Sequence, residues 1–339
     1  RIYSFPDYEV PQGHTSISWL RHICEQAAKY KYAHADEELW SRLKDRLKRE
    51  FGMIEKFSLA GFLLQYHDII KMAQEVQVDL GVVDPGTKLE DHPPGRGRGS
   101  SVALVIGYLI GLSHIDPLEF DLRLERFLPD FDEGEDVPSL DIDLDFPRDI
   151  REELILRIHK RLGFEHAVLT GMFPTYKVRG AIRDLGNALG LPEDDLVNLI
   201  KLIDGHSGIN DLTNEMGRLP GYRDRLDAPL WKELVELALQ LNRFPKYLAQ
   251  HPGGMILSAQ PMSEAVPLEH GAIDGRYICQ WDKNSVEDAG FVKIDFLALG
   301  ALSQMTEALQ LIRIYKERTV DISRIDFTDI AVYRDIQNA

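Results

Sequence analysis

Three aspartates alternate with apolar residues in the middle of the chain. They are Asp141, Asp143 and Asp145, separated by Ile142 and Leu144. Residues two apart in a β-strand share a face, so the three carboxylates would project together at Cα spacings of about 6.5 Å. Such carboxylates repel one another unless cations neutralise them, and their hard oxygen atoms suit Mg²⁺ or Mn²⁺. The pattern predicts a strand that holds the metal ions of two-metal phosphoryl transfer. The alternative is an acidic, solvent-facing side of an antiparallel strand.

The same stretch carries the outline of a calcium-binding loop. Counted from Asp141, acidic residues fall at positions 1, 3, 5 and 12, the last being Glu152. Position 6 is Phe146, although the sharp turn of such a loop requires glycine there, and Pro147 follows. The alternation of acidic and apolar residues favours an extended strand over such a loop. If the calcium loop did form, the protein would be a calcium-binding or structural interaction module without catalysis, which is the alternative function.

A second acidic strand is expected near the end of the chain. Lys293 and Asp295 fall on one face of the otherwise apolar run from Phe291 to Leu297. A nearly buried charged pair costs free energy unless it has partners. This strand could add a third carboxylate to the metal site and bring Lys293 near a phosphate. A strand end in contact with solvent explains the segment equally well.

A glycine-rich stretch could bind phosphate. Gly95 to Ser101 has the sequence Gly-Arg-Gly-Arg-Gly-Ser-Ser and precedes an apolar segment expected to be helical. Glycines let backbone N–H groups turn toward one point, the helix N-terminus adds positive partial charge, and Arg98 and Ser100 add donors. The stretch lacks the lysine of a Walker loop, and its third glycine is misplaced for a dinucleotide-binding fingerprint. A plain flexible loop is the alternative.

Composition indicates an ordinary globular chain of two or three domains. Of 339 residues, 44% are hydrophobic and 28% are charged, which excludes disordered and collagen-like classes. The longest apolar run, Val102 to Leu112, has about half of the roughly 20 residues that a membrane-spanning helix needs. Two distant cysteines exclude a disulfide scaffold and fit a reducing, cytoplasmic setting. Without an initiator Met or a leader, we expect a piece of a longer protein.

The net charge is unevenly distributed. The whole chain carries 39 basic and 55 acidic residues, a net charge of −16, which by itself argues against nucleic-acid binding. Eleven acidic residues and two arginines lie between Pro129 and Glu153. Six basic residues and one glutamate then lie between Arg157 and Arg183. The change of sign indicates a cation-binding centre beside an anion-binding surface, or else two solvated faces.

The expected elements alternate between sheet and helices. Helical periodicity covers most of the first 75 residues, and Val76 to Gly97 is expected to be a loop. A helical module is expected from Phe173 to Lys246. Strand-like runs are Asp141 to Phe146, Gly254 to Leu257, Tyr277 to Trp281 and Phe291 to Phe296. The order predicts an α+β fold in which a helical insertion interrupts a mixed β-sheet flanked by helices.

Seven motifs in a fixed order carry a family resemblance. They are the glycine–arginine stretch, Asp116-Pro117-Leu118-Glu119-Phe120, Glu125-Arg126-Phe127-Leu128, Asp141 to Phe146, His251-Pro252-Gly253-Gly254, Gln280-Trp281-Asp282-Lys283 and Lys293 to Leu297. Together they resemble the catalytic core of the bacterial C-family DNA polymerases, the alpha subunits of DNA polymerase III, from about Gly13 to the end. The glycine–arginine stretch and the residues after Asp145 are closer to the error-prone branch of that family.

The resemblance implies a nucleotidyltransferase-like palm with an inserted thumb. The first part of the palm would span residues 1–172, with helices over 1–75, a glycine- and proline-rich loop over 76–100, and the sheet with the catalytic strand over 101–172. The helical thumb would span 173–247 and the second part of the palm 248–305. Residues 306–339 would begin the fingers.

The resemblance also assigns site residues. Asp141, Asp143 and Asp295 would be the catalytic, metal-binding carboxylates. Residues expected to contact the incoming triphosphate are Arg98, Gly99, Ser100, Arg126 and Lys293. Residues expected to contact DNA phosphates are Lys177, Arg179 and Arg183. The family usually opens the acidic strand with Pro-Asp, whereas Pro138 and Ser139 stand here; aligning on Phe146 keeps every carboxylate.

The implied function is DNA-directed DNA synthesis in replication or repair. The reaction would transfer a nucleotidyl group from a dNTP to a primer 3′-hydroxyl with two Mg²⁺ ions, or Mn²⁺ in their place. Expected partners are primer–template DNA, dNTP, and a sliding clamp and other replication or repair proteins reached through regions outside this sequence, with no membrane. The expected location is the bacterial cytoplasm, in association with the nucleoid.

Overall fold

The computed structural model describes residues 8–126, 142–204, 208–291, 293–320, 322 and 328–338. These residues form an α+β fold of twelve α-helices and one open, mixed sheet of seven strands. The chain divides into two compact units. One joins Arg1–Thr170 to His251–Ala339, and the other is Gly171–Gln250.

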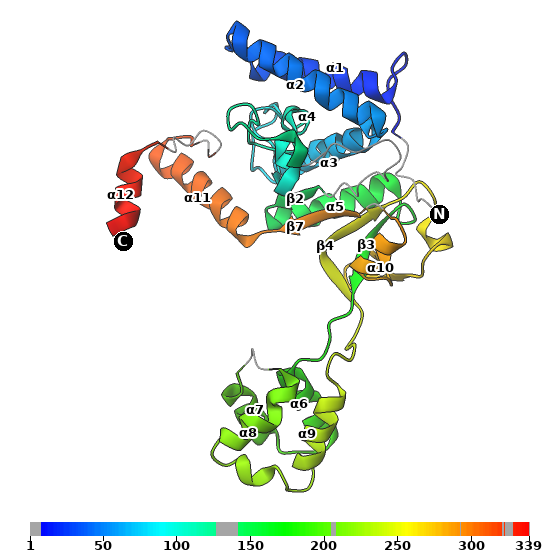
Figure 1. The fold of residues 1–339 in the computed structure, drawn as a ribbon, viewed down its shortest axis with the longest axis vertical. Coiled ribbons are helices and arrows are strands. Elements are labelled where there is room, and N and C mark those ends of the chain that lie inside the picture. The colour runs from blue at the N-terminus through cyan, green and yellow to red at the C-terminus, as the bar shows by residue number, and fades with distance from the viewer. Residues whose placement is uncertain are drawn as a thin grey trace. The chain divides into compact units, whose positions relative to one another are not determined.

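Three helices cover the N-terminal region, as the periodicity predicts. They are α1 (Ser16–Lys31), α2 (Glu37–Lys56) and α3 (Ala60–Asp79), and they lie close together in Figure 1. Thr15 caps α1, because its side chain accepts a hydrogen bond from the backbone N–H of Ser18. The prediction of a loop from residue 76 is wrong at its start, because buried Val76 extends the apolar face of α3 to Asp79.

The glycine–arginine stretch and the apolar segment behind it also differ from the prediction. Arg96–Arg98 form strand β1, followed by a 3₁₀ turn, η1 (Gly99–Ala103), and the short helix α4 (Val105–Leu109). Gly97 makes the strand possible: its N–H donates to the carbonyl of Leu112 at 2.8 Å, and a Cβ on Gly97 would lie 2.4 Å from that oxygen. The sequence pattern does not predict this strand, because its pairing comes from residues far away in the chain.

The sheet has the order β1-β2-β7-β4-β3-β6-β5. Its remaining strands are β2 (Asp143–Phe146), β3 (Ala167–Met172), β4 (Ala249–Leu257), β5 (Leu268–His270), β6 (Tyr277–Cys279) and β7 (Lys293–Ala298). Strand β2 is antiparallel to β1 and parallel to β7, which is itself antiparallel to β4. The four strand predictions are confirmed, with ends shifted by up to five residues.

One core joins the N-terminal helices to the acidic strands. Leu144 and Phe146 of β2 and Ile294 and Phe296 of β7 are fully buried, and the two phenylalanine rings meet edge to face at 5.9 Å. Helix α5 (Arg148–Leu162) adds Leu154, Ile155 and Ile158 to the same core, and it packs against both α3 and β7. The apolar members of the alternating motifs therefore anchor the strands and leave the acidic members on the opposite face.

The unit Gly171–Gln250 has a core of its own. It holds α6 (Val178–Ala188), α7 (Glu193–Leu202), α8 (Leu212–Arg218) and α9 (Trp231–Gln240), which are seen together in Figure 1. Their buried side chains, among them Ile182, Leu199 and Leu234, form a cluster separate from the core of the sheet. The predicted helical interruption of the sheet is confirmed, because these helices come between β3 and β4 in sequence.

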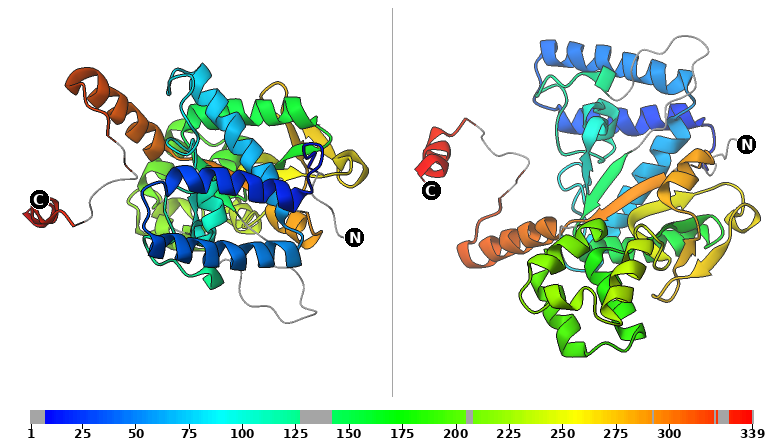
Figure 2. Two further views of the ribbon diagram at one scale, coloured as in Figure 1. Left: turned by 90° about the horizontal axis from the view of Figure 1, so that it is seen from above. Right: turned by 60° about the horizontal axis from the view of Figure 1, so that its bottom comes forward.

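Three further helices follow in the sheet-containing unit. They are α10 (Lys283–Asp288), α11 (Gly300–Lys316) and α12 (Ile330–Asn338). Helix α11 starts two residues after β7 and leads away from the sheet in both views of Figure 2. No residue of α11 is buried.

Candidate functional site

The two acidic strands are neighbours in register. Strands β2 and β7 run parallel, with Asp143 directly opposite Asp295. Side chains at paired positions lie on the same face of a sheet, and Asp145 shares that face because it lies two residues after Asp143. The structure thus brings together carboxylates separated by about 150 residues in sequence. Asp141, the other predicted ligand on this strand, lies outside the described residues.

Arg98 completes this cluster from the other side of β2. It pairs with Asp143 in the antiparallel β1–β2 ladder. Its guanidinium group lies 3.1 Å from Asp143 Oδ2 and 3.2 Å from Asp145 Oδ2. One arginine therefore balances two carboxylates that would otherwise repel each other.

Lys293 is the second cation at the site. Its ammonium group donates to Asp295 Oδ2 at 2.6 Å and lies 3.6 Å from Glu287 Oε1 on α10. Both members of the Lys293–Asp295 pair are buried, as the alternation along this strand predicts. Ion pairing compensates part of the cost of removing them from water.

Burial affects the carboxylates unequally. Asp145 and Asp295 are only 5% and 7% exposed, whereas Asp143 is partly accessible. Burial raises the pKa of Asp145, the neighbouring Asp143 raises it further, and Arg98 opposes both effects. Oδ1 of Asp145 and Oδ1 of Asp295 are buried without a hydrogen-bond partner among the described residues.

These orphaned oxygens make the cluster a suitable cation site. A buried carboxylate oxygen without a donor is unfavourable, and a hard divalent cation would satisfy it. Within the described part of the chain, however, no three His, Cys, Asp or Glu side chains already form a metal cage. The donor set fits Mg²⁺, but the ligands would have to close around the ion.

The His-Pro-Gly-Gly motif forms part of the wall of the site. Gly254 pairs with Asp295 between β4 and β7. His251 Nδ1 accepts hydrogen bonds from the N–H groups of Gly253 and Gly254, at 3.3 and 2.9 Å, and so shapes the backbone itself. A Cβ on Gly254 would lie 2.4 Å from Thr170 Oγ1, which explains the glycine at that position.

A buried arginine makes hydrogen bonds both to this motif and to strand β7. Arg151 on α5 is 4% exposed and donates through Nε to the carbonyl of Phe296 at 2.7 Å. It also donates to the carbonyl of Pro252 and pairs with Glu152. The sequence gives no strong signal for this residue, because arginine on a helix is ordinarily exposed.

The residues predicted to cradle phosphate form a strand end and a 3₁₀ turn, and their contact with phosphate remains a prediction. Arg98, Gly99 and Ser100 are exposed there, and Gly99 has a positive φ of 74°. The hydroxyl of Ser101 donates to the carbonyl of Arg98 at 2.9 Å, which closes the turn. Arg126 ends the 3₁₀ turn η2 (Leu124–Arg126).

The three predicted DNA-contacting residues lie in the other unit. Lys177 is the N-cap residue of α6, and Arg179 and Arg183 lie on that helix. All three are exposed, and Arg179 donates to the carbonyl of Ile203 at 2.7 Å. They share one element, as expected for a basic surface, and contact with DNA remains a prediction.

Asp145 is the site residue that the predicted ligand set omits. The signal is present in the sequence, because Asp145 is the third member of the alternating motif. The alternation alone does not show which aspartate of β2 lies opposite Asp295 on the neighbouring strand. The β2–β7 register shows that it is Asp143.

Comparison with known proteins finds one family model and several polymerases with similar sequences. Residues 18–298 match the family model of the bacterial DNA polymerase III alpha NTPase domain. The error-prone DNA polymerases of Pseudomonas fluorescens (strain Pf0-1) and Methylococcus capsulatus are 32% and 31% identical to the chain over 338 and 337 residues. The alignment with the error-prone DNA polymerase of Vibrio campbellii is 31% identical over 342 residues.

These relatives are much longer proteins. Each alignment covers 99% of this chain but only 30% or 31% of the relative. Among the described helices, none has the length and apolar character needed to span a membrane. The family model matches well over half of the sequence, and the predicted resemblance is confirmed: the chain belongs to the bacterial DNA polymerase III alpha NTPase domain family.

Proposed function

We propose that the chain carries the nucleotidyl-transfer site of a DNA-directed DNA polymerase. The reaction would form a bond between the primer 3′-oxygen and the α-phosphorus of a dNTP. It would break the bond from that phosphorus to the bridging oxygen, with release of pyrophosphate and loss of the hydroxyl proton. The observation that carries the proposal is the register of Asp143 with Asp295 beside Arg98 and Lys293.

The carboxylates would hold the divalent ions. Asp143 and Asp295 remain the proposed ligands, and the orphaned oxygen of Asp145 adds a third. Asp141 stays a prediction from the family. When bound, Mg²⁺ would lower the pKa of the primer hydroxyl and balance the charge of the triphosphate.

Arg98 would change partners when substrate binds. Its guanidinium now neutralises Asp143 and Asp145, two of the carboxylates that a divalent ion would use. Entry of the ion would free Arg98 for the triphosphate, for which a guanidinium is well suited. Gly99, Ser100, Arg126 and Lys293 would contribute to the same dNTP site.

The two units would have separate roles. In the sheet-containing unit, the residues up to 305 would be the palm and residues 306–339 the start of the fingers, and Gly171–Gln250 would be the thumb. Lys177, Arg179 and Arg183 would contact phosphates of primer–template DNA without reading its sequence. Basic residues concentrated on one helix can supply this contact even though the whole chain is acidic.

The calcium-loop alternative is wrong. Such a loop is twelve residues long, but Asp143–Phe146 form a strand and Arg148–Leu162 form a helix. Glu152, the expected final calcium ligand, pairs instead with Arg151 and Arg276.

A calorimetric titration of the chain with metal and nucleotide tests the proposal. We expect Mg²⁺ alone to bind weakly, because no cage is formed among the described residues, and dATP to strengthen its binding at least about tenfold. Asp295→Asn should remove this coupling. Mg²⁺ binding that is unchanged by dATP, or Ca²⁺ binding that is tighter than Mg²⁺ binding in the presence of dATP, would argue for an interaction module instead.

A further inference from the structure

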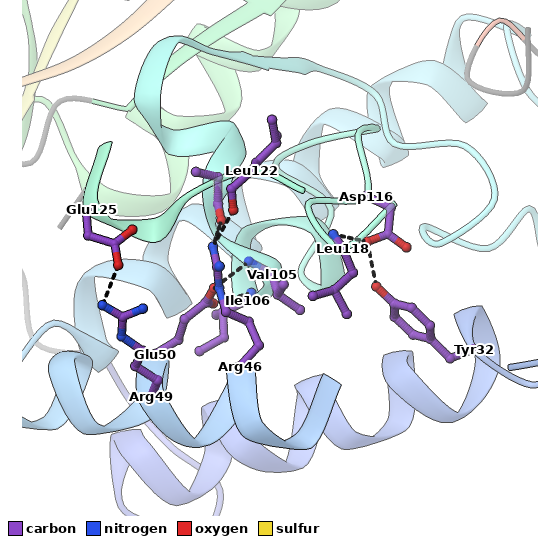
Figure 3. Close-up of polar contacts among 11 residues, drawn as sticks. Tyr32, Arg46, Arg49, Glu50, Val105, Ile106, Asp116, Leu118, Leu122 and Glu125 are labelled. Atoms are coloured by element: carbon purple, nitrogen blue, oxygen red, sulfur yellow. Dashed lines mark hydrogen bonds and ion pairs between the residues drawn. The ribbon is translucent and has the colours of Figure 1, made fainter. Parts of the chain in front are cut away.

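A fully buried glutamate on α2 lies outside the carboxylate cluster. Glu50 is 0% exposed, and its two carboxylate oxygens accept the N–H groups of Val105 and Ile106, each at 2.9 Å (Figure 3). These are the first two residues of α4, which is separated from the η1 turn by Leu104 alone. Glu50 therefore fixes the point at which the chain leaves the Gly99–Ala103 turn.

Arg46, one helical turn earlier, binds the same carboxylate and two further segments. Its Nε donates to Glu50 Oε1 at 2.8 Å. Its Nη2 donates to the carbonyl of Ala103 at 2.7 Å and to that of Leu122 at 3.1 Å (Figure 3). Ala103 is the last residue of η1, and Leu122 lies two residues before η2.

A third side chain of α2 extends this connection to η2. Arg49 Nη2 lies 2.5 Å from Glu125 Oε1, immediately before Arg126. This pair is exposed, so its contribution is small by itself. Helix α2 thus contacts both segments that carry the proposed triphosphate contacts: η1, which follows Arg98, and η2, which ends at Arg126.

The chemistry of the pair indicates a role in geometry. Burying a carboxylate is costly, and an apolar side chain would fill the same place more favourably. The charged pair, however, satisfies two N–H donors at the start of α4 and two carbonyl acceptors, and hydrogen bonds to charged groups are stronger than those between neutral groups. The interactions are directional, so they hold η1 and η2 at a defined distance from α2.

We propose that Glu50 and Arg46 are positioning residues for dNTP binding, which hold Arg98 to Ser100 and Arg126 where the triphosphate needs them. The inference rests on the proposed polymerase function. Neither residue touches the carboxylate cluster, and no motif of the sequence marks them. Their effect would reach the nucleotide through backbone contacts alone.

Steady-state primer extension with Glu50→Gln tests the inference in the natural protein that carries this sequence. Glutamine keeps the shape but offers one acceptor oxygen, so one of the two N–H groups loses its partner and Arg46 loses its counter-ion. We expect the KM for dNTP to rise about tenfold, with kcat changed less than about threefold, because triphosphate contacts act in both ground and transition states. The KM for primer–template DNA should not change.

Arg46→Lys provides a second variant, and Glu55→Gln a matched control. Lysine keeps the charge but lacks the second nitrogen that lets Arg46 bind Glu50 through Nε and both carbonyls through Nη2, so the KM for dNTP should again rise. Glu55 lies on the same helix, is exposed, and faces Arg21 at 3.8 Å. Its replacement should leave both KM values unchanged. Thermal unfolding of each variant establishes that it is folded.

Several outcomes would overturn the inference. One is a folded Glu50→Gln or Arg46→Lys variant with the KM of the unmodified protein for dNTP. Another is an equal rise of the KM values for dNTP and DNA, which would indicate general loosening. If neither variant folds, Glu50 and Arg46 serve only to stabilise the fold, and they are not positioning residues for dNTP. If the unmodified protein does not extend a primer at all, the proposed function has failed, and with it the basis of the inference.

Discussion

Replacing Asp143 or Asp295 by asparagine should nearly abolish primer extension by the natural protein that carries this sequence. Asparagine keeps the shape of the side chain but removes the charge that a divalent ion requires. The two residues face each other across β2 and β7, so loss of either would disrupt the same ion site. We expect kcat to fall on the order of a thousandfold or more, the scale of losing preorganised charge in an active site. Single-turnover extension of a labelled primer measures it.

Asp149→Asn is the matched control for these variants. Asp149 belongs to the same acidic stretch but lies exposed in the first turn of α5. Its replacement changes the net charge by the same amount and should alter the extension rate less than about twofold. Loss of activity in Asp149→Asn as large as in Asp143→Asn would show that overall charge, and not the ion site, is responsible.

Gly97→Ala should destabilise β1 and displace Arg98. The new Cβ would lie 2.4 Å from the carbonyl oxygen of Leu112, a backbone atom that cannot rotate away. We expect the free energy of unfolding to fall by about 3 kcal/mol, which is at the upper end of the effects of overpacking. Amide hydrogen exchange over Arg96–Arg98 and Asp143–Phe146 should then accelerate on the order of a hundredfold.

Replacing Gly52 by alanine, in contrast, should stabilise the folded protein. Gly52 is exposed inside α2, and a Cβ there would meet nothing within 4 Å. Alanine should stabilise the helix by about 0.5–1 kcal/mol, because glycine loses more backbone entropy on folding. Unchanged exchange over β1 in Gly97→Ala would mean that the backbone around Leu112 yields easily, and that Gly97 does not determine the position of Arg98.

Local pattern predicts most of the elements. The acidic alternation predicts strand β2, and helical periodicity predicts α1 to α3 and the helices between β3 and β4. These signals work because side-chain burial repeats with the period of the backbone. The family resemblance then selects Asp143, Asp295 and Arg98 from many charged residues, and the structure brings these three together.

Long-range pairing is what the sequence does not show. Strand β1 has only three residues, with glycine at its centre, and exists because β2 lies beside it. The contact of Arg98 with two carboxylates depends on that register. Glu50 and Arg46 carry no sequence signal for a related reason, since their partners are backbone groups about 55 to 76 residues away.

The position of a bound metal ion tests the central claim most directly. Crystals of the chain grown with dNTP and Mn²⁺ would locate the ion through its anomalous scattering. We predict an Mn²⁺ peak at about 2.2 Å from carboxylate oxygens of both Asp143 and Asp295, a bonding distance for a small, hard cation. Mn²⁺ bound through other residues, with Arg98 still paired to Asp143 and Asp145 in the presence of nucleotide, would contradict the account.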